Sequence, residues 1–595
     1  MGLIKTAFLL YSMYSIYITL LFTNIQAGGL GMLTKWGENI DKNNVLGEYP
    51  RPQMRRSSYI NLNGLWDYAF TAAGEKRPDS WDGQILVPFS PECELSGVGR
   101  MLKSDEYLWY RRDWVKPDVP DGYRVILHFG AVDQSCTVYI NGLRAYRHAG
   151  GYLPFEFDAT GFLSKEINEI SLSVRDVSDS SYHSRGKQKL KRGGIWYTPQ
   201  SGIWQSVWAE CIPHDCVKAL HITPDFDNAC VSVRADTVGD SRAYAIFGEQ
   251  QYQLPAVIPV PDFEPWSPEN PKLYDFSVIC GEDRVDSYFA MRKFSVEADS
   301  DGVKRLFLNG KPYFHNGLLD QGYWSDGMYT APSDEALIFD IQTAKEMGFN
   351  MLRKHIKIEP LRWYYHCDRL GMLVWQDMIN GGGSYNPAVI SAPLVTGVHL
   401  SDKNYGLFAR NDLEGRVEYE TELNEMIELL YNCPCIAMWV PFNEGWGQFD
   451  AARIAEKIAN ADPTRTIDHA SGWHDQKIGE TKSLHVYFKK YVFKPDKLGR
   501  AVMLTEFGGY NFRCSGHSFG KADFGYKKLK SEKNLQKALE KLYSEQIKPA
   551  FKQGLSAAVY TQLSDVEEEV NGLITYDRKV VKLSPDIIKK IIKVD

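Results

Sequence analysis

The sequence lacks several features that mark whole classes of protein. It has no long run of basic residues, and its formal net charge is −7. Nothing therefore indicates a nucleic acid or an anionic membrane surface as a partner. None of its ten cysteines belongs to a Cys-x-x-Cys pair or to a His/Cys cluster with zinc spacing, so no structural zinc site is predicted. No asparagine is followed by x-Ser/Thr, so the chain has no acceptor for an N-linked glycan, which favours a bacterial protein.

Long hydrophobic segments are also missing, except at the N-terminus. Lys5 is followed by an apolar stretch from Ala7 to Phe22 and then by the small residues Ala27-Gly28-Gly29. This pattern predicts a secretory signal peptide at residues 1–27 and a secreted or periplasmic protein. Because no charged residue occurs between Lys5 and Lys35, an uncleaved N-terminal membrane anchor is the alternative. No later stretch approaches the ~18 apolar residues of a membrane-spanning helix.

The chain is long and rich in aromatic residues. Its 595 residues are too many for one hydrophobic core, so several domains are expected. The apolar content of 44% and the charged content of 24% are those of an ordinary soluble globular protein. The aromatic content of 13% is explained mainly by the cores of large β-domains, and some of these rings are available to stack on sugars.

The first part of the chain, residues 28 to about 212, shows the pattern of an all-β domain. Alternating apolar and polar residues predict strands at 123–129, 136–140 and 169–174, and Asn141-Gly142 predicts a tight turn. Recurring short strands of this kind are typical of a double-sheet jelly roll. Residues 213 to about 298 contain shorter strands rich in Val, Phe and Tyr, and predict a second, compact β-domain.

From about residue 299 to the end, strands alternate with helices. Ser333 is predicted to cap a helix that ends at Gly348, and Pro360 and Gly371 bound the next helix. The segment from about 379 to 420 is rich in Gly, Asn and Asp and is predicted to be a rim loop. Eight short apolar segments suit a (β/α)8 barrel, and they lie at 314–319, 350–353, 372–377, 435–442, 466–470, 483–487, 502–505 and 557–561.

Two glutamates follow two of these predicted strands. Asn443 and Glu444 come directly after the apolar segment 435–442, and Glu506 comes after 502–505. The carboxyl ends of barrel strands are where active sites are built. A pair of carboxylates there is the arrangement with which an acid and a nucleophile act on one bound sugar. The alternative for each glutamate is a helix cap or a surface salt bridge.

These motifs resemble those of a known family. Asn443-Glu444 and Thr505-Glu506-Phe507-Gly508 are similar to the acid/base and nucleophile motifs of glycoside hydrolase family 2, which includes β-galactosidases, β-glucuronidases and β-mannosidases. The resemblance extends over nearly the whole chain after the signal segment. It implies a sugar-binding-like jelly roll at 28–212, an immunoglobulin-like sandwich at 213–298 and a catalytic TIM barrel at 299–595.

The resemblance also implies an activity and roles for single residues. It implies a retaining exo-β-glycosidase that acts on β-galactosides, with β-glucuronides, β-mannosides and α-L-arabinosides as alternative substrates. A non-catalytic carbohydrate-binding protein is the alternative from another class. In the family pattern Glu444 is the acid/base, Glu506 the nucleophile, and Asn443 binds the sugar 2-hydroxyl. Tyr487 lies beside the nucleophile. Arg353 would orient Glu506 by a charge-assisted bond, and His355 would contact the sugar.

Further residues on strand-end loops are candidates for the sugar pocket, with core packing as the alternative for the aromatic ones: Asp320, Asp377, Trp446, Trp473, Tyr560, Gln562 and Asp565. Two departures from the family matter. The stretch Asp377-Met378-Ile379-Asn380-Gly381 lacks the magnesium ligands of the galactosidase branch, so no catalytic metal and no other cofactor are predicted. The stretch Asn571-Gly572-Leu573-Ile574 lacks the lysine with which the glucuronidase branch binds the sugar carboxylate, which disfavours a uronic acid substrate. The predicted partner is a carbohydrate, and a homo-oligomer is left open.

Overall fold

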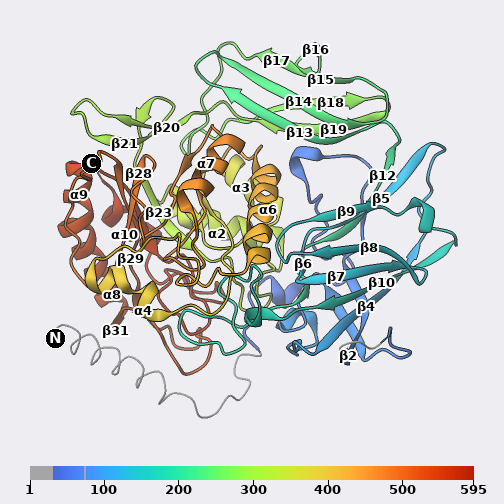
Figure 1. Cartoon of the computed structure of the whole chain (residues 1–595), viewed down its shortest axis with the longest axis horizontal. Coiled ribbons are helices and arrows are strands. Elements are labelled where there is room, and N and C mark those ends of the chain that lie inside the picture. Colours follow the sequence, from blue (N-terminus) through green and yellow to red (C-terminus); the bar gives the residue numbers. More distant parts are fainter. Residues whose placement is uncertain (1–30, 73–75, 595) are drawn as a thin grey trace.

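The computed structural model describes residues 31–72 and 76–594. The predicted signal segment, residues 1–27, lies outside the described residues. The described chain forms three parts (Figure 1): a β-sandwich on the right, a barrel with helices around it on the left, and a smaller β-sandwich at the top. This confirms the predicted multidomain fold with a jelly roll, an immunoglobulin-like sandwich and a TIM barrel. In this part of the chain no helix has the length and apolar character needed to cross a membrane.

The first part consists of two antiparallel sheets that pack face to face. Their strand orders are β3-β2-β4-β10-β7-β8 and β1-β12-β5-β9, and the short strands β6 and β11 form a separate pair. Apolar side chains alternate toward the space between the sheets and bury Trp66, Tyr110 and Phe129 there. The strands are β1 (Ile60–Asn61), β2 (Gly64–Ala72), β3 (Gly83–Val87), β4 (Glu106–Val115), β5 (Tyr123–Phe129), β6 (Val132–Asp133), β7 (Ser135–Ile140), β8 (Leu143–Ala149), β9 (Phe155–Asp158), β10 (Ile167–Arg175), β11 (Gly202–Ile203) and β12 (Val207–Pro213).

The second part has two smaller antiparallel sheets, β13-β14-β17 and β16-β15-β18-β19. Trp266, which the sequence places in this part, is fully buried in the core of the barrel, where its Nε1 donates to the carbonyl oxygen of Asp368 at 2.8 Å. This tryptophan therefore fastens the sandwich to the barrel. The strands are β13 (Cys216–Asp225), β14 (Cys230–Val238), β15 (Ala243–Phe247), β16 (Gln250–Gln253), β17 (Ala256–Pro259), β18 (Tyr274–Cys280) and β19 (Asp283–Phe289).

A small antiparallel sheet joins the second part to the barrel. It contains β20 (Phe294–Ala298), β21 (Lys304–Leu308) and β22 (Lys311–Pro312). Phe294 and Val296 of β20 pack in the same core as the barrel strands, not in the core of the sandwich. The segment around Phe294, which the sequence pattern assigned to the end of the second domain, therefore belongs to the barrel in its packing.

The third part is an eight-stranded, all-parallel sheet in the order β27-β26-β25-β24-β23-β32-β29-β28. All residues of the central strands β23 to β26 and of β29 and β32 are buried, as expected for strands covered on both faces. Side chains link the two end strands: the Thr481 hydroxyl donates to the Ile467 carbonyl oxygen at 2.8 Å. The strands are β23 (His315–Asp320), β24 (Met351–Lys354), β25 (Leu373–Asp377), β26 (Ile436–Val440), β27 (Thr466–Ile467), β28 (Thr481–Val486), β29 (Ala501–Gly508) and β32 (Leu555–Thr561).

Helices cover the outside of this sheet (Figure 1). Helix α2 (Asp334–Glu346) begins where predicted, because the Ser333 side chain accepts a hydrogen bond from Ala336 N. Helix α3 (Leu361–Leu370) follows Pro360 and ends at Gly371, as predicted. The other helices are α4 (Pro387–Ile390), α5 (Ala392–Thr396), α6 (Leu413–Leu430), α7 (Ala451–Ala461), α8 (Glu532–Leu542), α9 (Lys548–Gln553) and α10 (Pro585–Ile592), and the short strands β30 (Tyr510–Phe512) and β31 (Lys527–Leu529) form a parallel pair.

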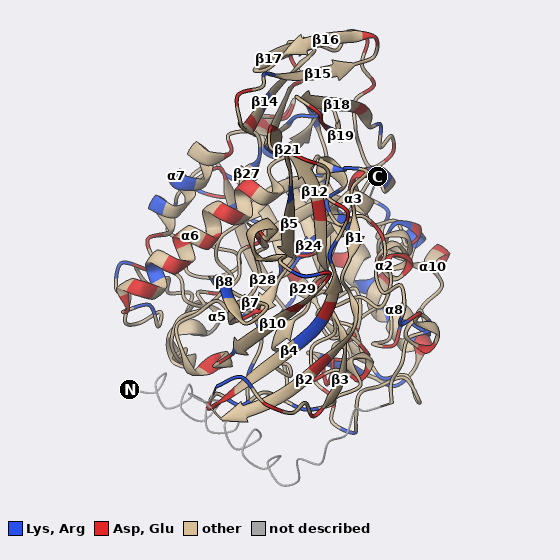
Figure 2. Cartoon of the chain, turned by 90° about the vertical axis from the view of Figure 1, so that its right-hand side faces the viewer, with Lys and Arg blue, Asp and Glu red and all other residues tan. Residues whose placement is uncertain are grey.

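The predicted rim loop at 379–420 is wrong over its last part. Helix α6 already begins at Leu413, because the Asp412 side chain caps it by accepting from Gly415 N at 2.7 Å. Its buried stripe, which includes Tyr419, Leu423 and Leu430, holds the helix against the barrel. Acidic residues predominate on the rest of α6 (Figure 2), so that face is exposed to water.

All ten cysteines are free thiols. Five of them are buried in the cores of the three parts, at Cys136, Cys280, Cys367, Cys433 and Cys435. These five cysteines therefore contribute to packing in this structure.

Candidate functional site

Glu506 lies inside β29, at a bulge. Pairing with β28 joins Leu484 to Leu504 and then His485 to Glu506, so Thr505 is an extra residue in β29. A second shift separates Leu504 from Phe507 in the pairing with β32. A bulge of this kind changes the direction in which a side chain points and often occurs beside an active site. The sequence placed Glu506 after its strand, whereas the irregular strand itself carries it.

Glycines after Glu506 make room for aromatic rings. Gly508 has a φ of +87°, and a Cβ atom there would lie 2.3 Å from the ring of Tyr560. At Gly509 a Cβ atom would lie 2.3 Å from the ring of Tyr526, which stacks on Tyr487 with ring centroids 3.7 Å apart. The Glu-Phe-Gly-Gly sequence is thus required for close packing around the carboxylate.

Glu444 lies in the loop after β26, in a left-handed backbone conformation with a φ of +51°. A non-glycine residue adopts this region at a cost of about 1–3 kcal/mol, and such residues cluster at functional sites. A backbone bridge between Asn443 and Ser471 and a hydrogen bond from Glu444 N to the Ser471 carbonyl oxygen (3.0 Å) hold the loop in place. The side chain of Glu444 is buried, with 8% of the residue exposed.

The two carboxylates face each other in different electrostatic surroundings. One oxygen of Glu444 and one of Glu506 lie within 4.8 Å of each other. Burial raises the pKa of Glu444, and the negative charge of Glu506 adds to this effect. Burial also acts to raise the pKa of Glu506, but the charges of His485 and Arg353 outweigh it and hold that pKa below its ordinary value. Of the two carboxyl groups, the site therefore favours the proton on Glu444 and the charge on Glu506.

Arg353, at the end of β24, connects the site residues. Its guanidinium donates two bonds to Asp377 (2.9 and 3.0 Å), one to Asn443 Oδ1 (2.9 Å) and one to Glu506 Oε1 (3.3 Å). A guanidinium presents donors in a rigid planar fork, so this network fixes the orientation of Asp377 and Glu506. The Nδ2 atom of Asn443 is buried and has no partner, so it remains available to a ligand.

Tyr487 and His355 complete this network. The Tyr487 hydroxyl donates to Glu506 Oε2, so both oxygens of Glu506 have a donor. Nδ1 of His355 lies 2.7 Å from Asp377 Oδ2. Burial and the nearby charge of Lys187 lower the pKa of His355 well below its usual range, so the ring is neutral at pH 7. Nδ1–H then donates to Asp377, and Nε2 is left as an acceptor.

His485 is a site residue that the sequence reasoning missed. Its Nδ1 atom lies 2.8 Å from Glu444 Oε1 and 3.4 Å from Glu506 Oε2. Gly472 lies against the ring, since a Cβ atom there would be 2.4 Å from it. The signal was present in the sequence: His485 precedes Tyr487 by two residues, and alternate residues of a strand point to the same side.

Four of the sequence candidates make their hydrogen bonds to residues outside this network. Asp320 binds Lys354 and Gly322 N, at 2.7 and 2.9 Å. Asp565 Oδ1 binds Lys582 and Gly572 N, at 2.7 and 2.8 Å, whereas its Oδ2 is buried without a partner among the described residues. Gln562 bonds to Gln321 and Asn571, and Tyr560 is buried against Gly508. These four residues support the strand ends, and the network of Arg353, Glu444 and Glu506 does not include them.

Aromatic side chains form the walls of the site. Trp446, two residues after Glu444, packs against Trp196 of the first β-sandwich, with ring centroids 5.1 Å apart, and stacks on Tyr385 at 6.4 Å. Trp473 packs against His485, and its Nε1 atom is buried without a partner. An indole face beside an unpaired N–H is suited to an apolar ring that also carries hydroxyl groups.

Comparison with known proteins decides the family. The model described as "Glycosyl hydrolases family 2, sugar binding domain" matches residues 103–209, and the one described as "Glycosyl hydrolases family 2, TIM barrel domain" matches residues 301–507. The chain belongs to glycoside hydrolase family 2.

Its similarity to single members of family 2 is distant. The chain is 25% identical to a β-galactosidase of Thermoanaerobacter pseudethanolicus, over 68% of this chain and 55% of the relative. It is also 25% identical to a putative β-glucuronidase of Formosa agariphila, over 62% of this chain and 42% of the relative. The alignments thus span about half the length of these relatives. The solved structure of a β-glucuronidase from Dictyoglomus thermophilum covers 92% of this chain and 99% of its own, with a TM-score of 0.71 and 16% identity, which shows the same fold.

The site residues offer few ligands to a metal ion. Within the described ranges, Glu444, His485 and Glu506 are the one group of side chains that could hold a metal ion. Magnesium requires six oxygen ligands in a near-octahedral arrangement, and these three side chains offer one imidazole and two facing carboxylates. Asp377, at the place where the galactosidase branch has its ligands, is engaged by Arg353 and His355. The residues do not fit a resident magnesium ion.

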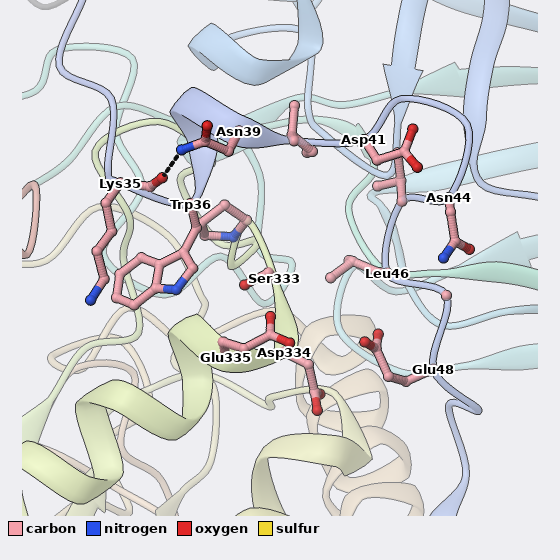
Figure 3. A pocket seen from close by; sticks show the side chains of 14 residues that line it. Lys35, Trp36, Asn39, Asp41, Asn44, Leu46, Glu48, Ser333, Asp334 and Glu335 are labelled. Carbon is pink, nitrogen blue, oxygen red and sulfur yellow. Dashed lines mark hydrogen bonds between the residues drawn. The ribbon is translucent and has the colours of Figure 1, made fainter.

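A separate cavity of about 490 Å³ lies between the segment 35–48 and the start of α2 (Figure 3). It is lined by Lys35, Trp36, Glu48, Asp334 and Glu335 among others, and none of the site residues described above faces it. Asp334 in its wall already binds Arg362 and His366. The cavity is therefore a feature of the outer surface, distinct from the barrel mouth.

Proposed function

We propose that this family 2 chain is a retaining β-glycosidase that uses Glu506 as nucleophile and Glu444 as acid/base. The observation that carries the proposal is the pair of facing carboxylates, with oxygens within 4.8 Å, whose pKa values are shifted in opposite directions. Retaining glycosidases have carboxyl groups about 5–5.5 Å apart, whereas inverting enzymes need about 6.5–9.5 Å to hold a water molecule. Facing oxygens within 4.8 Å of each other agree with the shorter of these separations, so we propose retention.

In the first step the charged Glu506 attacks the anomeric carbon while Glu444 gives its proton to the leaving oxygen. Arg353 and Tyr487 donate to the two oxygens of Glu506 and hold the carboxylate in the orientation needed to attack the anomeric carbon. Asn443 Nδ2, which has no partner in the described chain, is placed to bond the 2-hydroxyl of the sugar. A bond to this hydroxyl strengthens as positive charge develops at the anomeric carbon.

In the second step a water molecule replaces the leaving group. Burial and the negative charge of Glu506 raise the pKa of Glu444, and esterification of Glu506 removes that charge. The hydrogen bond from His485 then favours the charged form of Glu444, which can take a proton from the water. The same residue thus acts first as acid and then as base, and the sugar leaves with its original β configuration.

The proposal also concerns which sugar is removed from the substrate. Sequence resemblance points to β-galactosides, and the two relatives carry the names β-galactosidase and putative β-glucuronidase. We also propose, from the N-terminal apolar segment, that the protein acts in the periplasm or outside the cell.

The test is turnover of a panel of nitrophenyl glycosides: β-galactoside, β-glucuronide, β-galacturonide, β-mannoside and α-L-arabinoside. Proton NMR of the first-formed sugar should show the β anomer for a β-glycoside. An α anomer at early times would contradict retention, and no release from any substrate would favour a carbohydrate-binding protein without activity.

A further inference from the structure

One buried lysine beside the site has no partner. Within the described ranges four lysines are buried, and three of them are fully engaged. Lys354 binds Asp320 and Glu359, and the other two have both carboxylate and carbonyl acceptors: Lys357 with Glu359, Gly322 and Tyr329, and Lys582 with Asp565, Phe512 and Val570. Lys187 is only 7% exposed, and no acceptor among the described residues lies within hydrogen-bond reach of its Nζ atom.

Such an arrangement leaves the ammonium group available to a ligand. Charged groups of buried residues are normally paired, because burial weakens their solvation. Two rings lie near this one: Nζ is 5.7 Å from the ring centre of Tyr197 and 5.8 Å from that of Trp446. Both distances are near the ~6 Å limit of a cation–π contact, which contributes only about 0.5–2 kcal/mol.

Lys187 belongs to the first β-sandwich but lies at the mouth of the barrel. It is part of the connection 176–201 between β10 and β11. The backbone N–H groups of Arg185 and Gly186 donate to the carbonyl oxygen of Asn380, at 3.0 and 3.2 Å, just after β25. Tyr197 N donates to the Lys187 carbonyl oxygen at 2.9 Å. The connection is thus docked on the barrel, and its lysine is held in place next to the loop of Glu444.

The charge of Lys187 acts on the site residues. Burial raises the pKa of Glu444, and the hydrogen bond from His485 and the charge of Lys187 oppose that effect. Burial lowers the pKa of His355, and the charge of Lys187 lowers it further. The acid/base of the proposed mechanism, Glu444, and the neighbouring His355 are therefore within the electrostatic reach of Lys187.

We propose that Lys187 binds an anionic substituent of the sugar at the barrel mouth, a carboxylate or a sulfate ester. The inference rests on the proposed function and names the substrate class for the same site. A lysine ammonium is a compact point charge that suits either anion. The stretch after Asn571 lacks the lysine with which the glucuronidase branch binds the sugar carboxylate. Lys187 supplies a positive charge from another domain instead.

The residues beyond Lys187 extend this positive character away from the site. Five of the eight residues from 185 to 192 are basic and none is acidic, although the whole chain has a net charge of −7. Lys189 lies 4.0 Å above the ring of Trp196, which packs on Trp446. Lys189 thus places a second positive charge beside the aromatic wall, whereas Arg192 is paired with Glu567 and Glu568.

The experiment compares anionic and neutral substrates of the same configuration. kcat/KM is measured for nitrophenyl β-galactoside, β-galacturonide and 6-O-sulfo-β-galactoside with the wild-type protein, Lys187→Met and Lys187→Arg. The readout is the ratio of the anionic to the neutral substrate. We expect the wild type to prefer one of the two anionic sugars, and Lys187→Met to lower that ratio ~10-fold or more, because a hydrogen bond to a charged group is lost. Lys187→Arg should keep most of the ratio.

Lys191→Met is the matched control, because Lys191 is an exposed residue of the same connection and its loss changes the net charge equally. It should leave the ratio near the wild-type value. Equal losses in Lys187→Met and Lys191→Met would overturn the inference, as would a wild type that prefers the neutral galactoside. Lys187→Gln provides a second neutral side chain in case Lys187→Met does not fold, and thermal melting checks both.

Calorimetric binding separates the two proposals, because it needs no turnover. Galacturonate and galactose 6-sulfate are compared with galactose on the wild type and on Lys187→Met. If the protein cleaves neutral glycosides but neither binds nor cleaves the anionic ones, the inference fails and the proposed function stands. If it cleaves nothing but binds an anionic sugar through Lys187, the proposed function fails and the inference stands.

Discussion

The Nδ1 atom of His485 lies 2.8 Å from the Oε1 atom of Glu444, and both side chains are buried. The acid of the proposed mechanism therefore has a hydrogen-bonding partner of its own, in addition to its electrostatic coupling with Glu506. The bond to His485 lowers the pKa of Glu444 and so affects the pH at which Glu444 loses its proton.

The pH dependence should reflect this pair. kcat/KM requires a charged Glu506 and a protonated Glu444, so it falls as pH decreases through the lowered pKa of Glu506 and as pH increases through the raised pKa of Glu444. His485→Phe removes a bond that lowers the pKa of Glu444. We therefore expect the high-pH limb of the profile to move to higher pH in this variant. An unchanged limb, or one moved to lower pH, would contradict the role given to His485.

Replacing the nucleophile should abolish turnover without unfolding the protein. Glu506→Gln keeps the shape of the side chain and its bond to Arg353, but it cannot form the glycosyl ester. We expect kcat to fall by about 10³-fold or more, with an unchanged melting temperature within ~2 °C. The variant is compared with the wild type on the best nitrophenyl glycoside of the panel. Near-wild-type activity would refute the assignment.

Loss of the acid/base should depend on the leaving group. Glu444→Ala cannot protonate the departing oxygen, so alkyl glycosides should lose about 10²–10⁴-fold in kcat/KM. Activated aryl glycosides, which leave without a proton, should lose much less in the first step. Azide needs no general base and should restore turnover of the aryl substrate, with a β-glycosyl azide as product. Equal losses on both substrate types would argue against this role.

Removal of metal ions should leave the reaction intact. The side chains that a bound ion would use are the two reacting carboxylates and His485, so an ion there would block the chemistry. We expect exhaustive EDTA treatment to change kcat/KM by less than about 1.5-fold. A loss that added magnesium restores would show that the residues after β25 bind a metal ion after all.

One prediction concerns the support of the strand ends. Lys582 and Asp565 are both buried and bind each other at 2.7 Å. Lys582→Met leaves the Asp565 carboxylate without its cation, and we expect a loss of about 3–5 kcal/mol in the free energy of unfolding. Urea denaturation followed by tryptophan fluorescence measures the change. The double variant Lys582→Met/Asp565→Leu should recover part of the loss, and a fully additive loss would contradict the pairing.

Much of the fold follows from local sequence patterns. The strand predicted at 123–129 coincides with β5, and the cap at Ser333 begins α2 as expected. Alternation of side chains and capping act over a few residues, so they can be recognised in a single sequence. Helix α6 was missed at its start because Gly, Asn and Asp before it conceal the cap at Asp412.

The sequence predicted the site residues that belong to recognisable short motifs at the ends of strands. Glu444, Glu506, Asn443, Arg353, His355 and Tyr487 do come together in the structure. The pairing of Asp565 with Lys582 and the docking of Lys187 depend on contacts between distant segments, and local patterns do not encode them. The bulge at Thr505 likewise arises from the register between strands, which a strand pattern alone does not specify.

Because the connection 176–201 belongs to the first β-sandwich, mutations there can change substrate recognition independently of bond cleavage. The groups that break the bond lie on barrel strands and their loops, whereas the lysine proposed to recognise the anion lies on a loop of a different domain. A descendant of this chain can exchange that loop, lengthen it or replace its basic residues without moving either glutamate. After gene duplication, one copy can acquire a new substrate through mutations far from the reacting atoms. In the laboratory, chimaeras that carry this connection from other members of the family can be used to change the substrate preference.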